Sequence, residues 1–176
     1  RLYVESWQSA VFNELAGWRM KHLPSEVTEG DIVLVTTDPA ASGASGKKGL
    51  SAWDVSAVKK NGHAPHLVSA DDATSGIFTF EHVVVPLLGS KVRLPKWAPT
   101  LISDLVERDM ATIVAREHKS KEYTLKGSYR HLIVVPKNLE VLQCGDDSEA
   151  TQVSFDLPPA AYATELVAKL ASEGAE

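Results

Sequence analysis

The chain has 176 residues, of which 18 are Lys or Arg and 23 are Asp or Glu, so its formal net charge is −5. This length suits one domain, or one domain with a smaller insert, and a hydrophobic content of 44% is typical of a globular protein. The single cysteine, Cys144, excludes an intrachain disulfide framework and a cysteine-cluster metal site. No apolar run approaches the roughly 20 residues of a membrane-spanning helix. We expect an intracellular protein with neither a signal peptide nor a membrane partner.

Charge is unevenly spread along the chain. Residues 116–137 carry six basic and two acidic side chains, whereas residues 144–176 carry seven acidic side chains against Lys169 alone. A basic stretch between neutral and acidic flanks is typical of a strip that binds phosphates. An ordinary solvated face has the same pattern, so charge alone leaves both interpretations open.

The first predicted element is a helix over residues 6–20. Trp7, Val11, Leu15 and Trp18 fall on one stripe of such a helix, because successive residues are rotated by about 100°. This stripe indicates an apolar face that packs on a core.

The apolar run Ile32–Val35 predicts a short buried strand. The stretch that follows, residues 37–76, is rich in Ala, Ser, Gly and Lys, and its low-complexity core at 40–49 is predicted to be mobile. We interpret this stretch as an insertion and expect regular structure to resume near Pro65.

Turn signals and apolar patterns define the remaining elements. The first are a strand at 78–88 ending at Pro86, a segment at Val92–Leu94 that pairs with it, and a helix at 99–110. A strand at 132–135 follows, which Pro136 ends. The last are a hairpin of 139–143 and 152–157 joined at 145–147, and a helix at 160–171 preceded by Pro159. Helices and strands are mixed along the chain without a repeat. The sequence therefore predicts an α+β fold.

The first helix carries polar side chains where its apolar stripe ends. Gln8 and Arg19 lie close together on the helical wheel at this edge, and Ser9 and Asn13 are one turn apart on the adjacent face. A buried amide or guanidinium needs hydrogen-bond partners. Either these groups fix the helix against the core, or they line a nucleotide or phosphate site.

A second polar segment, residues 123–131, leads into a predicted strand. Lys126 and Arg130 suit phosphates, and Tyr129 can stack on a base. Gly127 between them lets the backbone approach a ligand closely. The alternative is an ordinary turn with solvated cations.

A third segment, residues 155–164, joins a strand to the last helix through Pro158. A helix N-terminus at this junction offers unpaired N–H groups that attract anions, close to Tyr162 and Thr164. The alternative is a simple change of chain direction.

Other chemistries are poorly matched by the sequence. His63 and His66 are spaced as a metal pair but lie in the predicted insert with no third ligand suggested. The glycine spacing of residues 43–48 fails the pattern of a phosphate-binding loop. Cys144, next to the predicted hairpin turn, is interpreted as a small strand residue and not as a nucleophile.

Taken together, the polar segments resemble the TruD family of tRNA pseudouridine synthases, in particular its eukaryotic and archaeal branch. Five family elements occur in the family's order: Trp7–Asn13 with Arg19, Gly30–Val33, Val83–Gly89 with Pro95, Leu125–Arg130, and Phe155–Pro158 with Tyr162–Thr164. The family's Arg-Glu pair after the last element is replaced here by Ala168 and Lys169. The ordered recurrence over nearly the whole chain carries the resemblance.

This resemblance implies a division into three parts. They are residues 1–26, a helix segment of the catalytic domain; residues 27–122, the family's inserted domain with a disordered-like insert near 38–64; and residues 123–176, the carboxy-terminal part of the catalytic domain.

The resemblance also implies the isomerisation of uridine to pseudouridine in RNA, with tRNA as the expected substrate. The family uses one essential Asp and neither a metal nor an organic cofactor. In the family this Asp and an Asn-x-x-Gly-x-x-Arg-Phe-Gly segment lie upstream of the first helix, and no Asp of this sequence sits in a matching motif. We therefore expect the chain to be the carboxy-terminal part of such an enzyme, without a catalytic residue and inactive alone.

Site residues follow from the matching motifs. The expected RNA or substrate contacts are Lys126, Tyr129, Arg130, Tyr162 and Thr164, and the expected supports of the cleft are Gln8, Ser9, Asn13 and Arg19. An alternative function is a stand-alone RNA- or protein-binding module without catalysis, which the basic stretch fits equally well. A piece of a larger sheet can also self-associate through an exposed apolar edge.

Overall fold

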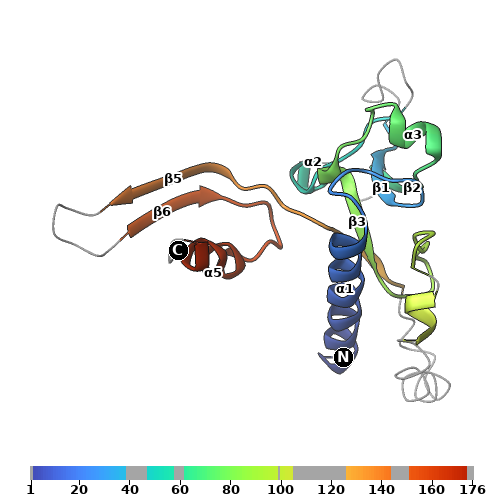
Figure 1. Cartoon of the computed structure of the whole chain (residues 1–176), viewed down its shortest axis with the longest axis horizontal. Helices are drawn as coiled ribbons and strands as arrows, with labels where there is room; N and C mark the ends of the chain where they lie inside the picture. The colour runs from blue at the N-terminus through green and yellow to red at the C-terminus, as the bar shows by residue number, and fades with distance from the viewer. Residues whose placement is uncertain are drawn as a thin grey trace. The chain divides into compact units, whose positions relative to one another are not determined.

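The computed structural model describes residues 2–38, 47–57, 62–98, 100–104, 126–143 and 151–173. It contains two compact units, Arg1–Ile133 and Val134–Glu176. Both units combine a helix with antiparallel strands, so the predicted α+β class is confirmed (Figure 1). Within the described residues, no helix is both long and apolar enough to cross a membrane. The predicted boundaries at residues 26 and 122 stay predictions.

A four-stranded sheet organises the first unit. Its strands are β1 (Ile32–Thr36), β2 (His63–Leu67), β3 (Val83–Leu87) and β4 (Ser128–His131), in the order β2-β1-β3-β4. Every neighbouring pair is antiparallel, and β1 is confirmed where the sequence predicted it. Because β3 is flanked on both sides and is almost wholly buried, it is the centre of this unit.

The helix α1 (Leu2–His22) packs on one face of the sheet at β3, and Figure 1 shows it beside that strand. Its buried side chains Val11, Phe12 and Leu15 pack in one cluster with Val85 and Leu88. The predicted helix is therefore confirmed, with its apolar stripe facing the core. Since successive strand residues point to opposite faces, Val84 turns away from α1 and joins a different cluster.

Shorter segments cover the rest of the sheet. The helix α2 (Ala52–Ala57) and Leu50 lie on the face opposite α1, where Leu50 is only 2% exposed. The helix α3 (Ala70–Thr74) lies on the same face as α1, over the β1 and β2 side, with Phe78 and Val68. A single 3-10 turn, Phe80–His82, leads into β3.

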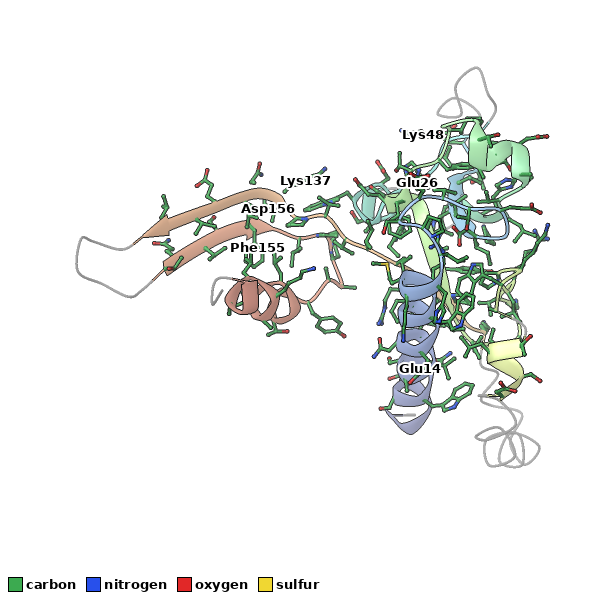
Figure 2. All side chains as sticks on the ribbon, in the orientation of Figure 1. Glu14, Glu26, Lys48, Lys137, Phe155 and Asp156 are labelled. Carbon is green, nitrogen blue, oxygen red and sulfur yellow. The ribbon has the colours of Figure 1, made fainter. Side chains whose placement is uncertain are left out.

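The second unit is a hairpin followed by a helix. The strands β5 (Lys137–Gln143) and β6 (Thr151–Asp156) pair with Lys137 opposite Asp156, and α5 (Ala163–Glu173) completes the unit. Figure 2 shows Phe155 on the side of the hairpin toward α5. The predicted hairpin and last helix are thus confirmed.

Several predicted elements are wrong in position. The predicted strand at 132–135 is replaced by β4 at 128–131, because Tyr129 supplies the core contact while Val134 and Val135 stay 37% and 44% exposed. Regular structure resumes before Pro65, at α2, because Leu50 anchors that segment to the sheet. The positive φ of Ala160, 68°, delays the last helix to Ala163.

Other predicted elements differ from the structure in extent or pairing, or lie outside the described residues. Residues 78–82 turn into β3 through the 3-10 segment and are not strand, and Val92–Leu94 pairs with no strand of the described sheets. Pro86 lies inside β3 rather than at its end; β4 pairs with it there, while β1 pairs only as far as Val84. Residues 40–46, 105–110 and 145–147 lie outside the described part of the chain.

Two half-buried histidines lie on the α2 face of the sheet. The Nε2 atom of His131 donates to the carbonyl of Leu50 at 2.9 Å. The Nδ1 atom of His82 accepts the backbone N–H of Thr79 at 3.0 Å, and its ring fills the space beside Gly49. Burial lowers the pKa of both imidazoles below 6.5, because it disfavours the charged ring.

These histidines predict a loss of stability in acid. Because their folded-state pKa lies below the unfolded-state value of about 6.5, the unfolded chain binds more protons in that window. The contribution of these histidines to the free energy of unfolding is complete above about pH 6.5, and it decreases as the pH drops toward the folded-state pKa. His131→Gln, which keeps a donor for Leu50 without titrating, is expected to flatten this slope.

Urea unfolding followed by tryptophan fluorescence between about pH 7.5 and pH 5 measures the slope, since all four tryptophans lie in the first unit. His22→Gln is the matched control, because His22 is exposed. If the unfolding free energy of His131→Gln depends on pH as steeply as that of the wild type, His131 does not contribute to the loss of stability in acid.

Candidate functional site

Adjacent residues of β4 point to opposite faces of the sheet. Arg130 lies on the face that α1 covers, with its guanidinium carbon 5.1 Å from the centroid of the Phe12 ring. Tyr129 lies on the other face and packs against the cluster of Ile32, Leu34 and Val84. The structure therefore brings Arg130, and not the ring of Tyr129, to the α1 face.

The turn before β4 crosses a second loop at very short range. Gly127 has a φ of 74°, and the backbone N–H of Lys91 donates to the carbonyl of Lys126 at 2.9 Å. A Cβ added to Gly89 would collide with the backbone of Gly127 and Lys126. This contact fixes the position at which β4 begins and leaves the Lys126 side chain exposed.

The hydroxyl of Tyr129 binds the same loop. It accepts the backbone N–H of Arg93 at 2.5 Å and donates to the carbonyl of Arg93 at 3.3 Å. The Tyr129 side chain therefore connects β4 to residues 89–93. Its predicted contact with RNA stays a prediction.

The polar residues of α1 differ in their surroundings. The amide Nε2 of Gln8 donates to the carbonyl of Leu88 at 2.6 Å and so ties α1 to the end of β3. Ser9 is half-buried and Asn13 is exposed. Gln8 is thus a contact between helix and core, while the predicted roles of Ser9 and Asn13 stay predictions.

Arg19 forms a fully buried ion pair with Asp31. Its Nε and Nη2 atoms donate to the two carboxylate oxygens at 2.8 Å each, and both side chains are 0% exposed. Nη1 also donates to the carbonyl of Pro24 at 2.8 Å, and Nη2 donates to the carbonyl of Glu26 at 2.6 Å. Of the two interpretations for this residue, the geometry favours the one in which hydrogen bonds fix the helix against the core.

The residues predicted to bind RNA are divided between the two units. Tyr162 is 67% exposed and Thr164 is exposed, both at the start of α5 in the second unit. Lys126, Tyr129 and Arg130 belong to the first unit. Residues 116–125 of the predicted basic stretch lie outside the described residues.

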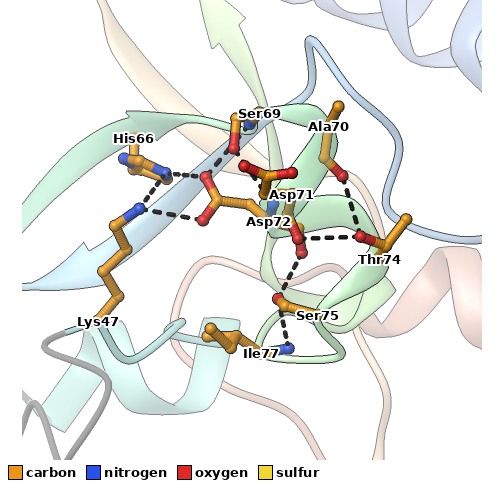
Figure 3. Close-up of polar contacts among 9 residues, drawn as sticks. All are labelled: Lys47, His66, Ser69, Ala70, Asp71, Asp72, Thr74, Ser75 and Ile77. Carbon is orange, nitrogen blue, oxygen red and sulfur yellow. Dashed lines mark hydrogen bonds and ion pairs between the residues drawn. The ribbon is translucent and has the colours of Figure 1, made fainter.

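A polar cluster that sequence reasoning missed joins β2 to α3 (Figure 3). Asp72 is bound by His66 Nε2 at 2.8 Å, by Lys47 Nζ at 3.0 Å and by the N–H of Ser69 at 3.2 Å. These hydrogen bonds, that of His66 above all, hold the pKa of Asp72 well below its usual range. The signal was the Ser69-x-x-Asp72 capping-box spacing, which starts a helix.

The geometry separates the two histidines that were spaced as a metal pair. His66 faces Phe78 on one side of β2, and His63 is an odd number of residues away, so it points to the other face. Across the parts of the chain that the structure describes, no three His, Cys, Asp or Glu side chains are grouped to hold a metal ion.

A family model described as tRNA pseudouridine synthase D (TruD) matches residues 1–170. The chain belongs to the TruD family. The Gln8 and Arg19 contacts, the Gly89–Gly127 crossing and the Arg130 stack therefore come from segments that the resemblance had singled out.

Curated relatives within the TruD family include three named pseudouridine synthases. Pseudouridylate synthase PUS7L of Danio rerio is 26% identical over 92% of this chain and 24% of its own length. Pseudouridylate synthase 7 homolog of Homo sapiens is 25% identical over 93% of this chain and 25% of its own length. Multisubstrate pseudouridine synthase 7 of Schizosaccharomyces pombe is 27% identical over 79% of this chain and 21% of its own length. The chain spans about a quarter of the length of these relatives.

The crossing of Gly89 and Gly127 predicts a strong asymmetry between two alanine substitutions. Gly89→Ala forces the backbone at Gly127 to move and is expected to cost about 2 kcal/mol of unfolding free energy. Gly17→Ala is the matched control: nothing lies within 4 Å of an added Cβ there, and Ala favours a helix by up to about 1 kcal/mol over Gly. Urea unfolding measures both changes, and equal stability of the two variants would refute the crossing.

Proposed function

We propose that the protein containing this chain is an RNA pseudouridine synthase, and that this chain contributes RNA binding beside the reacting uridine. The observation that carries the proposal is the family match over residues 1–170. Relatives named as pseudouridylate synthases support it. We propose tRNA as the substrate because the matching family is described as a family of tRNA pseudouridine synthases.

The proposed reaction is an isomerisation within one nucleotide. The bond from ribose C1′ to N1 of uracil breaks, the base turns, and a bond forms from C1′ to C5. C5 loses its hydrogen as a proton and N1 gains one, so atoms and electrons balance without an oxidant or a metal. The target base must leave its stack, which costs a few kcal/mol that contacts with the enzyme offset.

The free edge of the described sheet at β4, beside α1, is the proposed RNA surface of the first unit. Arg130 is held by the Phe12 ring in one orientation, and Lys126 is exposed next to the Gly127 turn. A guanidinium and an ammonium suit the negative charge of phosphates. Gln8 and Arg19 then act as positioning residues, since they connect α1 to its neighbours. The Tyr129 hydroxyl connects β4 to residues 89–93, and a contact of Tyr129 with RNA remains part of the proposal.

In the second unit, Tyr162 and Thr164 are proposed as a separate RNA contact. Tyr162 has an exposed ring that a base can stack on, and Thr164 has an exposed hydroxyl.

Tritium release from RNA carrying 5-tritiated uridine tests the proposed activity, because C5 exchanges its hydrogen only when the new bond forms there. The whole protein that carries this chain is expected to release tritium from tRNA transcripts. RNA binding without any release would instead support a binding module without catalysis.

The two cations predict a salt-dependent loss of RNA binding. Lys126→Gln and Arg130→Gln each remove a phosphate partner, so each is expected to weaken binding across all RNA sequences. The slope of log affinity against log salt should decrease by about 0.7 to 0.9 per charge removed.

Filter binding or fluorescence anisotropy across a salt series measures these slopes. Arg130→Lys keeps the charge and should preserve the slope, and Lys169→Gln in α5 controls for a charge removed elsewhere. Wild-type affinity at low salt in both neutral variants would exclude this surface.

A further inference from the structure

Three aromatic rings are stacked at the C-terminal end of α1. The ring centroids of Trp97 and Trp18 are 5.4 Å apart with planes inclined by 11°, and those of Trp18 and His22 are 4.8 Å apart with planes inclined by 19°. Trp97 and Trp18 are half-buried, whereas His22 is exposed. The stack therefore runs from the interior to the surface and ends in an exposed ring.

Hydrogen bonds fix both ends of this stack. The indole Nε1 of Trp97 donates to Asp31 Oδ1 at 2.9 Å, on the carboxylate that also holds Arg19. The imidazole Nδ1 of His22 donates to the carbonyl of Trp18 at 2.9 Å, one helical turn earlier. A ring held in this way loses little conformational freedom when a ligand binds to it.

The last turn of α1, which carries the exposed ring, has one exposed cation that no buried carboxylate of the described residues neutralises. Arg19, Lys21 and His22 occupy the last turn of α1, and Arg19 is neutralised by Asp31. Lys21 is exposed and forms no ion pair with any residue that the structure describes. A flat exposed ring next to a cation is suited to a planar base that carries a phosphate.

We propose that the exposed ring of His22, supported by Trp18 and Trp97, is a stacking site for one unpaired base of the bound RNA. This proposal rests on the proposed function, because it adds a base contact to an RNA surface. None of these three rings belongs to the motifs on which the family resemblance rests. A base stacked on this ring would give a preference for an unpaired nucleotide at one place along the RNA.

Binding of single-stranded oligouridine to the whole chain tests the proposal. His22→Ala is expected to weaken binding about 5-fold or more, the lower range for one base stacked on an aromatic side chain. His22→Phe keeps a ring without the imidazole and should restore most of the affinity. Met20→Ala is the matched control, since Met20 is 48% exposed on the same helix turn but is not part of the stack.

A second probe separates stacking from backbone contact. An oligonucleotide of the same length with abasic sites in place of the uridines keeps every phosphate but has no base to stack. The affinity of the chain for this oligonucleotide should therefore be the same with and without His22→Ala. An equal loss on both probes would overturn the proposal, and so would wild-type affinity of His22→Ala for oligouridine. If the wild-type chain binds neither oligonucleotide, the proposed RNA surface is wrong as well. If the wild-type chain binds both and Arg130→Gln weakens both, the RNA surface is supported independently of the result for His22.

Discussion

The buried ion pair of Arg19 and Asp31 is the interaction on which the first unit depends. Both side chains are fully buried, and Asp31 also accepts the indole of Trp97 and the backbone N–H of Thr28 at 2.9 Å each. Removal of one partner from such a pair costs about 3–5 kcal/mol, because the other charge stays buried without compensation. The pair therefore sets how α1 lies against the sheet, and with it the positions of Phe12 and Trp18.

The two cations of the proposed RNA surface are held in place by the backbone and by neighbouring side chains. Arg130 gains its orientation from Phe12 on α1, whose place is fixed by Gln8 at one end and by Arg19 at the other. Lys126 gains its place from the Gly89–Gly127 crossing. The proposed function is compatible with a net charge of −5, because the field at a bound phosphate depends mainly on the nearest cations.

The sequence predicted the elements that have a clear apolar pattern, including the short strand β1, and misplaced those that have none. The helix α1 and the β5–β6 hairpin have clear apolar periods, whereas β4 has Tyr129 as its core residue and precedes a more apolar run that stays exposed. The place of Arg19 beside the apolar stripe indicated only that its guanidinium would need hydrogen-bond partners if it were buried. Its partner Asp31, the loop contact of Tyr129 and the Lys47–Asp72 pair depend on tertiary contacts between distant segments, which no local pattern encodes.

Photo-cross-linking of the protein to RNA that contains 4-thiouridine, read by mass spectrometry, tests most directly whether RNA lies along the β4 edge beside α1. We predict cross-linked peptides from residues 126–131 and from the exposed side of α1. Cross-links confined to residues 47–57, on the opposite face of the sheet, would contradict the proposed surface.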